Sequence, residues 1–273
     1  MSLRTSPVAV AAGSLVVFGG LVAGLWWREH SNRPDPLAPP LIAYVAPTSR
    51  LPLEAIAADY ERDTGRRIEL RFGASEDILT KVRFPAPGEP ADVFIPADDS
   101  YIRQACELGL TAESLPLARV RAVVLLAKGN LKKLATWADL HRDGVTVAVP
   151  NPGAAVGKLA REHLAATRRW DALKPRVVDT GTVTEAANAA KLGSADAAVV
   201  WDAVAAAPAY VGQTVLTVPE LEGVNGRVEV AVLTQSRDPD AARAFAQYVA
   251  DPNRGLAHFR AAGFRVEEPG VKP

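Results

Sequence analysis

Small hydroxyl-bearing and glycine-rich segments recur before helical patterns in this sequence. They are Thr48 and Ser49 in "APTSRLPL", Gly73 to Ser75 in "FGAS", Pro150 to Gly157 in "PNPGAAVG", and Thr182 to Glu185 in "TVTE". The first turn of a helix leaves backbone N–H groups without partners and carries a positive charge of about half a unit. Several such turns directed at one place bind an anion without any lysine or arginine. The alternative is that these hydroxyls only cap their helices.

Other kinds of chemistry find little support. The segment "GAAVGKL" resembles a phosphate-binding loop, but its spacing is one residue short and Leu159 stands where Ser or Thr would bind magnesium. No G-x-S-x-G nucleophile motif is present. The single cysteine, Cys106, excludes an internal disulfide, and the 4 histidines show no zinc-like spacing. We therefore expect a protein that is not an enzyme and has no cofactor, with Cys106 packed inside a helix.

Composition limits the possible partners. The chain has 273 residues, of which 48% are hydrophobic and 23% charged, enough to bury the core of one large domain or two lobes. Lysine plus arginine and aspartate plus glutamate both number 31. A protein that binds nucleic acid uses an excess of basic residues to neutralise phosphates, so nucleic acid is not an expected partner.

The N-terminal segment is a separate unit. No charged residue occurs from Pro7 to Trp27, and a helix needs about 20 apolar residues to cross a bilayer. A cleaved signal peptide has a shorter apolar core, and this run ends in Trp26 and Trp27, which favour the membrane interface. We predict a transmembrane anchor, rather than a cleaved signal segment, in residues 1–27. A Pro-rich linker, residues 28–40, then holds the globular part on the periplasmic or extracellular side of the cytoplasmic membrane.

After residue 40 the sequence alternates between short apolar strands and amphipathic helices. Strands are expected at residues 41–46, 66–72, 91–97, 119–129, 144–150, 176–179, 196–201 and 227–234. Helices are expected over the segment before Gly65 and at residues 75–82, 99–110, 135–140, 156–169, 183–192, 239–249 and 253–262. Such alternation predicts a mainly parallel sheet covered by helices on both faces, with ligands at the carboxyl edge of the strands.

The segments quoted above also resemble a known family. From residue 41 to residue 264 the chain is similar to the periplasmic molybdate-binding proteins of ABC importers, which have the type II solute-binding fold. The runs "ADVFIPADDSYI" and "FRAAGF" carry this resemblance most specifically. It implies an α/β fold of two lobes, each a mainly parallel sheet flanked by helices. We expect lobe 1 to contain residues 41–118 and, together with the C-terminal tail, residues 226–273, and lobe 2 to contain residues 119–225.

The resemblance also implies a binding site. Members of this family hold a tetrahedral oxyanion between the two lobes with hydroxyl groups and backbone N–H groups. Matched position by position, these roles fall on the hydroxyl of Thr48, the hydroxyl and N–H of Ser75, the N–H of Val156, the N–H of Val183, and Trp201. Thr48 replaces the usual serine and Trp201 the usual tyrosine. An indole N–H donates but cannot accept, and the ring is larger, so a cavity of different size is expected.

Two carboxylates stand beside this expected site. Glu76 and Asp77 follow Ser75, where they suit the helix dipole but would repel an anion if they faced the cleft. We expect them to point into solvent; the alternative is that they bind a cation such as ferric iron. A further alternative is a membrane-tethered, ligand-sensing ectodomain without a transport role. The resemblance itself implies a monomeric protein that binds molybdate or tungstate and delivers it to an ABC importer permease.

Overall fold

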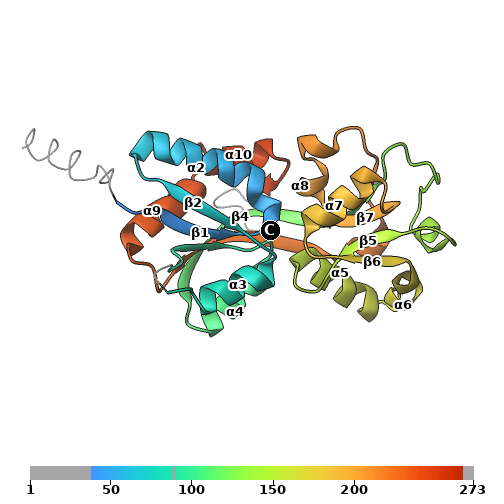
Figure 1. Ribbon diagram of the computed structural model, residues 1–273, viewed down its shortest axis with the longest axis horizontal. Coiled ribbons are helices and arrows are strands. Elements are labelled where there is room, and N and C mark those ends of the chain that lie inside the picture. The colour runs from blue at the N-terminus through green and yellow to red at the C-terminus, as the bar shows by residue number, and fades with distance from the viewer. Residues whose placement is uncertain (1–37, 88–89, 267–273) are drawn as a thin grey trace, which may run out of the picture.

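Two lobes of sheet and helix lie side by side in the computed structural model, which describes residues 38–87 and 90–266 (Figure 1). The two-lobed α/β architecture expected from the sequence is confirmed, but the expected mainly parallel sheets are mixed, because β4 (Thr111–Leu126) and β9 (Asn225–Leu233) pair antiparallel with their neighbours. Across the described part of the chain, no helix is both long enough and apolar enough to span a membrane. The expected anchor, residues 1–27, and most of the linker lie outside the described residues.

The sheet of lobe 1 is mixed, because three strands at one edge are parallel and the strands beside them are antiparallel. The parallel strands are β1 (Leu41–Val45), β2 (Ile68–Phe72) and β3 (Val93–Ile95), and the antiparallel ones are β9 (Asn225–Leu233), β4 (Thr111–Leu126) and β10 (Arg265–Val266). The helices of this lobe are the 3-10 helix η1 (Pro47–Ser49), α2 (Arg50–Thr64), α3 (Ser75–Arg83), α4 (Asp99–Glu107), α9 (Pro239–Val249) and α10 (Gly255–Ala261).

The sheet of lobe 2 repeats this mixed arrangement. Its parallel strands are β5 (Val147–Pro150), β6 (Val177–Thr180) and β7 (Ala197–Trp201), while β8 (Val215–Leu216) and β7 both pair antiparallel with β4. Its helices are α5 (Ala155–Ala166), α6 (Trp170–Leu173), α7 (Val183–Leu192) and α8 (Asp202–Ala205). Four short 3-10 helices join these elements: η2 (Ala138–His141), η3 (Lys174–Arg176), η4 (Pro208–Tyr210) and η5 (Pro219–Leu221).

Strand β4 connects the two lobes. Its first part pairs with β9 up to the Arg121 and Asn225 pair, and its last part, from Ala122 onwards, pairs with β7. The sequence predicted only the second part, as a strand over residues 119–129. The first part contains Pro116, which cannot donate to a ladder, and a register shift next to Pro116 accommodates it. Strand β4 belongs to both lobes, so it gives no single residue at which one lobe ends and the other begins. The expected lobe boundaries at residues 118 and 226 therefore stay a prediction.

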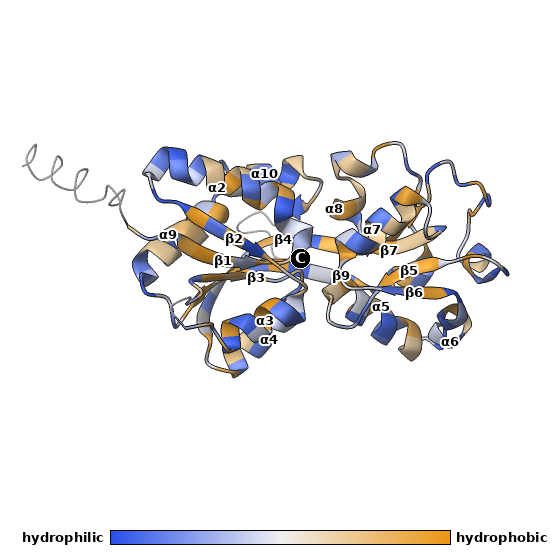
Figure 2. Ribbon diagram, viewed as in Figure 1, coloured by the Kyte–Doolittle hydropathy of each residue, from blue (hydrophilic) through white to orange (hydrophobic). Residues whose placement is uncertain are grey.

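Local sequence signals account for several helix ends. Gly65 ends α2 in the left-handed conformation, with a φ of 76°, as its capping position predicts. Hydrophobic residues concentrate in the strands, and the helices carry both hydrophobic and hydrophilic faces (Figure 2). One expectation is wrong: Cys106 lies on α4 but is exposed rather than packed. It is the penultimate residue of that helix, where the chain already turns towards solvent.

Candidate functional site

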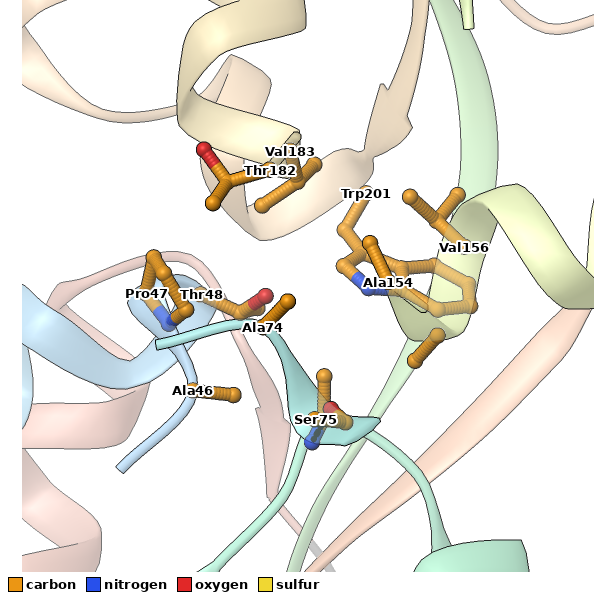
Figure 3. A pocket seen from close by; sticks show the side chains of 12 residues that line it. Ala46, Pro47, Thr48, Ala74, Ser75, Ala154, Val156, Thr182, Val183 and Trp201 are labelled. Atoms are coloured by element: carbon orange, nitrogen blue, oxygen red, sulfur yellow. Dashed lines mark hydrogen bonds between the residues drawn. The ribbon is translucent and has the colours of Figure 1, made fainter. Parts of the chain in front are cut away.

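A cavity between the two lobes brings the predicted binding residues together. It is lined by small side chains, hydroxyls and one indole: Ala46, Pro47, Thr48, Ala74, Ser75, Ala97, Ala154, Ala155, Val156, Thr182, Val183 and Trp201 (Figure 3). All five residues matched from the sequence are among them, although far apart in the chain. Its free volume is about 10 Å³, which is about the room that one water molecule needs. The lobes are therefore closed around it.

Each of these residues is placed by the end of a strand. Thr48 follows β1, Ser75 follows β2, Val156 follows β5 and Val183 follows β6, while Trp201 is the last residue of β7. Because the strands within each group are parallel, their carboxyl ends meet at one edge of a sheet. The two edges face each other across the cleft, and the cavity lies between them.

Two hydrogen-bond donors in the cavity have no acceptor. Thr48 is only 6% exposed and Trp201 is 0% exposed. Among the described residues, neither the hydroxyl oxygen of Thr48 nor the indole nitrogen of Trp201 has a hydrogen-bond partner within the protein. Figure 3 shows the Thr48 oxygen and the edge of the Trp201 ring facing the interior of the cavity. A buried polar group without a partner is rare and costs free energy, so an unpaired pair of donors at one cavity marks a place where a ligand can bind.

The Ser75 hydroxyl accepts one hydrogen bond, and its own proton is not used in that bond. Its hydroxyl oxygen accepts a hydrogen bond from the backbone N–H of Ala97 at 3.2 Å. The residue is 2% exposed, so its position is fixed by packing. With one lone pair used in this way, the hydroxyl keeps its own proton for donation into the cavity.

Helix capping explains only one of the hydroxyls. The Thr182 hydroxyl accepts from the N–H of Glu185 at 3.2 Å, as the capping box predicts. The Glu185 carboxylate reaches back to the N–H of Gly181, one residue before the position that the motif predicts. By contrast, no side chain caps η1, α2, α3 or α5. The alternative that Thr48 and Ser75 are only caps therefore does not fit the structure.

Backbone N–H groups supply the remaining donors. Val156 and Val183 lie in the first turns of α5 and α7, where N–H groups have no partner within the helix. The start of α5 packs closely on the end of β5: a Cβ atom on Gly157 would lie 2.1 Å from the carbonyl oxygen of Pro150. Any other residue at this position would push the helix away, and the N–H of Val156 with it.

No charged side chain lines the cavity. Glu76 and Asp77 are exposed and are not part of its lining. Over the described ranges, no group of three or more His, Cys, Asp or Glu residues is arranged to hold a metal ion. One buried acid lies close by: Asp98 follows Ala97 and is 2% exposed. Burial raises the pKa of Asp98 above its ordinary value, although the hydrogen bond from Ser100 and the charge of Lys158 act in the opposite direction.

Contacts across the cleft were not predicted from the sequence. The carbonyl oxygen of Gly153 in lobe 2 accepts hydrogen bonds from the N–H of Glu76 at 3.0 Å and from the hydroxyl of Tyr101 at 3.5 Å. Lys158 of lobe 2 donates to the hydroxyl of Ser100 at 3.3 Å. The periodicity of hydrophobic residues predicts which face of a single helix or strand is buried. It does not predict polar contacts between two lobes.

Comparison with known proteins gives the family. A profile of the family described as bacterial extracellular solute-binding protein matches residues 41–265. The molybdate-binding protein ModA of Mycobacterium tuberculosis is 32% identical over 188 residues, which are 68% of this chain and 69% of that protein. The molybdate-binding protein ModA of Escherichia coli is 25% identical over 224 residues, 79% of this chain and 84% of that protein.

A solved structure gives the same fold. The periplasmic molybdate-binding protein of Azotobacter vinelandii superposes with a TM-score of 0.70 at 20% sequence identity, covering 84% of this chain and 100% of that one. The family consists of solute-binding proteins that act outside the cytoplasm and are not enzymes. With its two lobes, its cavity and a profile match over residues 41–265, this chain belongs to the family of bacterial extracellular solute-binding proteins.

Proposed function

We propose that this protein captures a tetrahedral oxyanion, molybdate or tungstate, outside the cytoplasm and delivers it to an ABC importer. The ligand is held by the hydroxyls of Thr48 and Ser75, the indole N–H of Trp201 and the N–H groups of Val156 and Val183. The observation that carries the proposal is the pair of buried donors without acceptors, Thr48 and Trp201, in a cavity with no charged side chain.

The hydrogen-bond donors of the cavity suit an oxyanion, because every oxygen of such an anion accepts hydrogen bonds. Hydroxyl, indole and backbone N–H groups offer protons, and the first turns of α3, α5 and α7 add partial positive charge. Each charge-assisted hydrogen bond contributes about 1.5 to 3 kcal/mol before the cost of ordering. A cavity of about 10 Å³ has no room for an oxyanion, so binding requires the lobes to separate and close again. The names of the M. tuberculosis and E. coli relatives support molybdate as the ligand.

The proposal also includes a membrane anchor and an importer permease as the partner. Residues 7–27 anchor the protein, and the linker of residues 28–40 gives the binding domain reach towards a permease in the same membrane. A monomer suffices for this role, because the residues that form the cavity come from both lobes of a single chain.

Calorimetric titration of the purified full-length protein with molybdate, tungstate, sulfate, phosphate and ferric citrate tests the ligand. We expect a one-to-one complex with molybdate and tungstate and weaker or no binding of phosphate, which carries a proton at neutral pH and finds no carboxylate among the lining side chains to accept it. Binding of ferric citrate alone would favour the cation alternative and overturn the proposal. Binding of none of these anions would also overturn it.

A further inference from the structure

Lobe 2 meets lobe 1 through a small set of polar contacts on one side of the cavity. The Gly153 carbonyl accepts from the Glu76 N–H and the Tyr101 hydroxyl, at 3.0 and 3.5 Å. The approach is close: a Cβ atom on Gly153 would lie 3.6 Å from the Cβ of Glu76. Because Glu76 follows Ser75, and Gly153 precedes Ala154, these contacts adjoin the cavity wall on both sides.

Lys158 is the cation at this junction. Its ammonium group donates to the Ser100 hydroxyl at 3.3 Å and lies 4.9 Å from the centre of the Tyr101 ring. Both partners belong to lobe 1, whereas Lys158 belongs to α5 of lobe 2. The side chain is half-buried and does not line the cavity. Lys158 also belongs to the segment "GAAVGKL", whose likeness to a phosphate-binding loop has no role in the site described above.

Acidic groups act on the tyrosine that this lysine contacts. Asp98 is buried at the start of α4, with one carboxylate oxygen that has no partner. The negative charges of Asp98, Glu76, Glu162 and Asp77 all act on the buried hydroxyl of Tyr101. These groups come from α3, α4 and α5, the three helices that meet here. Without Lys158, an anion in the adjacent cavity would face an excess of negative charge on this side.

We propose that Lys158 is a positioning residue for anion capture, which holds the lobes closed and offsets the acidic charge beside the cavity only when they are closed. This inference rests on the proposed function for the ligand. In a separated cleft Lys158 leaves Ser100 and Tyr101, and its positive charge moves away from Asp98. Closure restores both, so a bound anion is released more slowly. Lys158 thus acts through the position of the lobes and not by contact with the ligand.

Measurement of molybdate association and release by stopped flow tests this role in three variants. Lys158→Met keeps the unbranched chain as far as Cε and removes the charged ammonium group, Lys158→Arg keeps the charge, and Lys174→Met removes one exposed charge from lobe 2 as a control. We expect Lys158→Met to weaken binding on the order of tenfold, mostly by faster release. Lys158→Arg should recover most of the loss, and Lys174→Met should bind like the parent.

The inference is overturned if Lys158→Met releases molybdate at the parent rate, or if Lys174→Met loses as much affinity. A ligand-free readout separates it from the proposed function. The Glu76 N–H is protected by Gly153 only while the cleft is closed, so hydrogen exchange around residues 75–79 should be faster in Lys158→Met than in the parent and Lys158→Arg. Equal exchange would contradict the inference. If the parent binds no molybdate, the proposed function fails, and this exchange experiment still decides the role of Lys158.

Discussion

The hydroxyl oxygen of Thr48 and the indole nitrogen of Trp201 line the same cavity from opposite lobes, both buried and both without a hydrogen-bond partner. An unpaired buried polar group costs about 1 to 3 kcal/mol. The protein itself supplies no acceptor for these two donors, and the acceptor oxygens of a ligand would satisfy both.

Replacing Thr48 by valine should separate binding from stability. Valine has nearly the same shape but no hydroxyl, so Thr48→Val should weaken molybdate binding by roughly tenfold to a hundredfold, the loss of one charge-assisted bond. The ligand-free protein should keep or gain stability, because an unpaired buried hydroxyl is removed. Titration and thermal unfolding of the same sample measure both quantities. Thr48→Ser, which keeps the hydroxyl, is the control, and parent-like affinity in Thr48→Val would remove Thr48 from the site.

Ser75→Ala should behave differently from Thr48→Val. It also removes a donor and should weaken binding by roughly tenfold to a hundredfold. In addition, it leaves the buried N–H of Ala97 without its acceptor, a loss of about 1 to 3 kcal/mol in the free energy of unfolding. Denaturant unfolding without ligand should show this loss for Ser75→Ala alone. If Ser75→Ala changes stability but not affinity, the hydroxyl serves the fold and not the ligand.

The double variant Glu76→Gln, Asp77→Asn distinguishes an anion from a cation as ligand. Both carboxylates are exposed and do not line the cavity, so their removal should leave molybdate affinity unchanged or slightly higher, by about 1 kcal/mol or less. A metal cation held by these residues would instead lose two charged oxygen ligands and bind far more weakly. Titration with molybdate and with ferric citrate decides between the two, because the expected changes have opposite signs.

Asp98→Asn should stabilise the protein at neutral pH and not at low pH. Burial raises the pKa of Asp98 in the folded state, so the folded protein holds this proton more tightly than the unfolded chain does. The destabilising effect of the carboxylate therefore appears as the pH rises through the folded-state pKa, and it is absent below the unfolded value of about 3.9. Melting temperatures of parent and variant should differ at pH 7 and converge in acid. A constant difference at every pH would contradict this account.

The N-terminal segment should remain on the mature protein. N-terminal sequencing of protein from the membrane fraction should find residues near position 1, because the apolar run from Pro7 to Trp27 is long enough to span a bilayer and ends in an interfacial tryptophan pair. A mature chain that begins between about residue 25 and residue 40 would identify the segment as a cleaved signal peptide.

The sequence predicts elements best where start and stop signals are local. Helices α7 and α9 have the expected bounds, residues 183–192 and 239–249, because Thr182 and Asp238 cap their starts. Strand β4 was only half predicted, since Pro116 interrupts its local pattern while the ladder with β9 continues past it. That ladder is a tertiary property, which propensity does not report.

Local signals predicted the helix starts that line the candidate site, and the resemblance supplied the individual residues and their roles. Residues such as Val156 and Trp201 show nothing unusual along the chain, and only the folded structure brings them to one cavity. The local sequence also predicted the same role for Thr48 and Thr182, a hydroxyl at the start of a helix. In the structure the Thr182 hydroxyl caps its helix, whereas the Thr48 hydroxyl does not. The contacts of Lys158 across the cleft depend on how the two lobes pack together. A local segment of sequence does not predict that packing.

The order of strands in lobe 1 also determines when this lobe can fold. Strand β3 pairs with β9 through Val93 and Val232, and β10 adds to β4 near the end of the described chain. Synthesis delivers the N-terminal strands first, and pairings so distant in sequence form slowly. The half of the site that holds Thr48 and Ser75 therefore stays incomplete until β9 has been synthesised. This late completion suits a domain that has to cross a membrane before it folds.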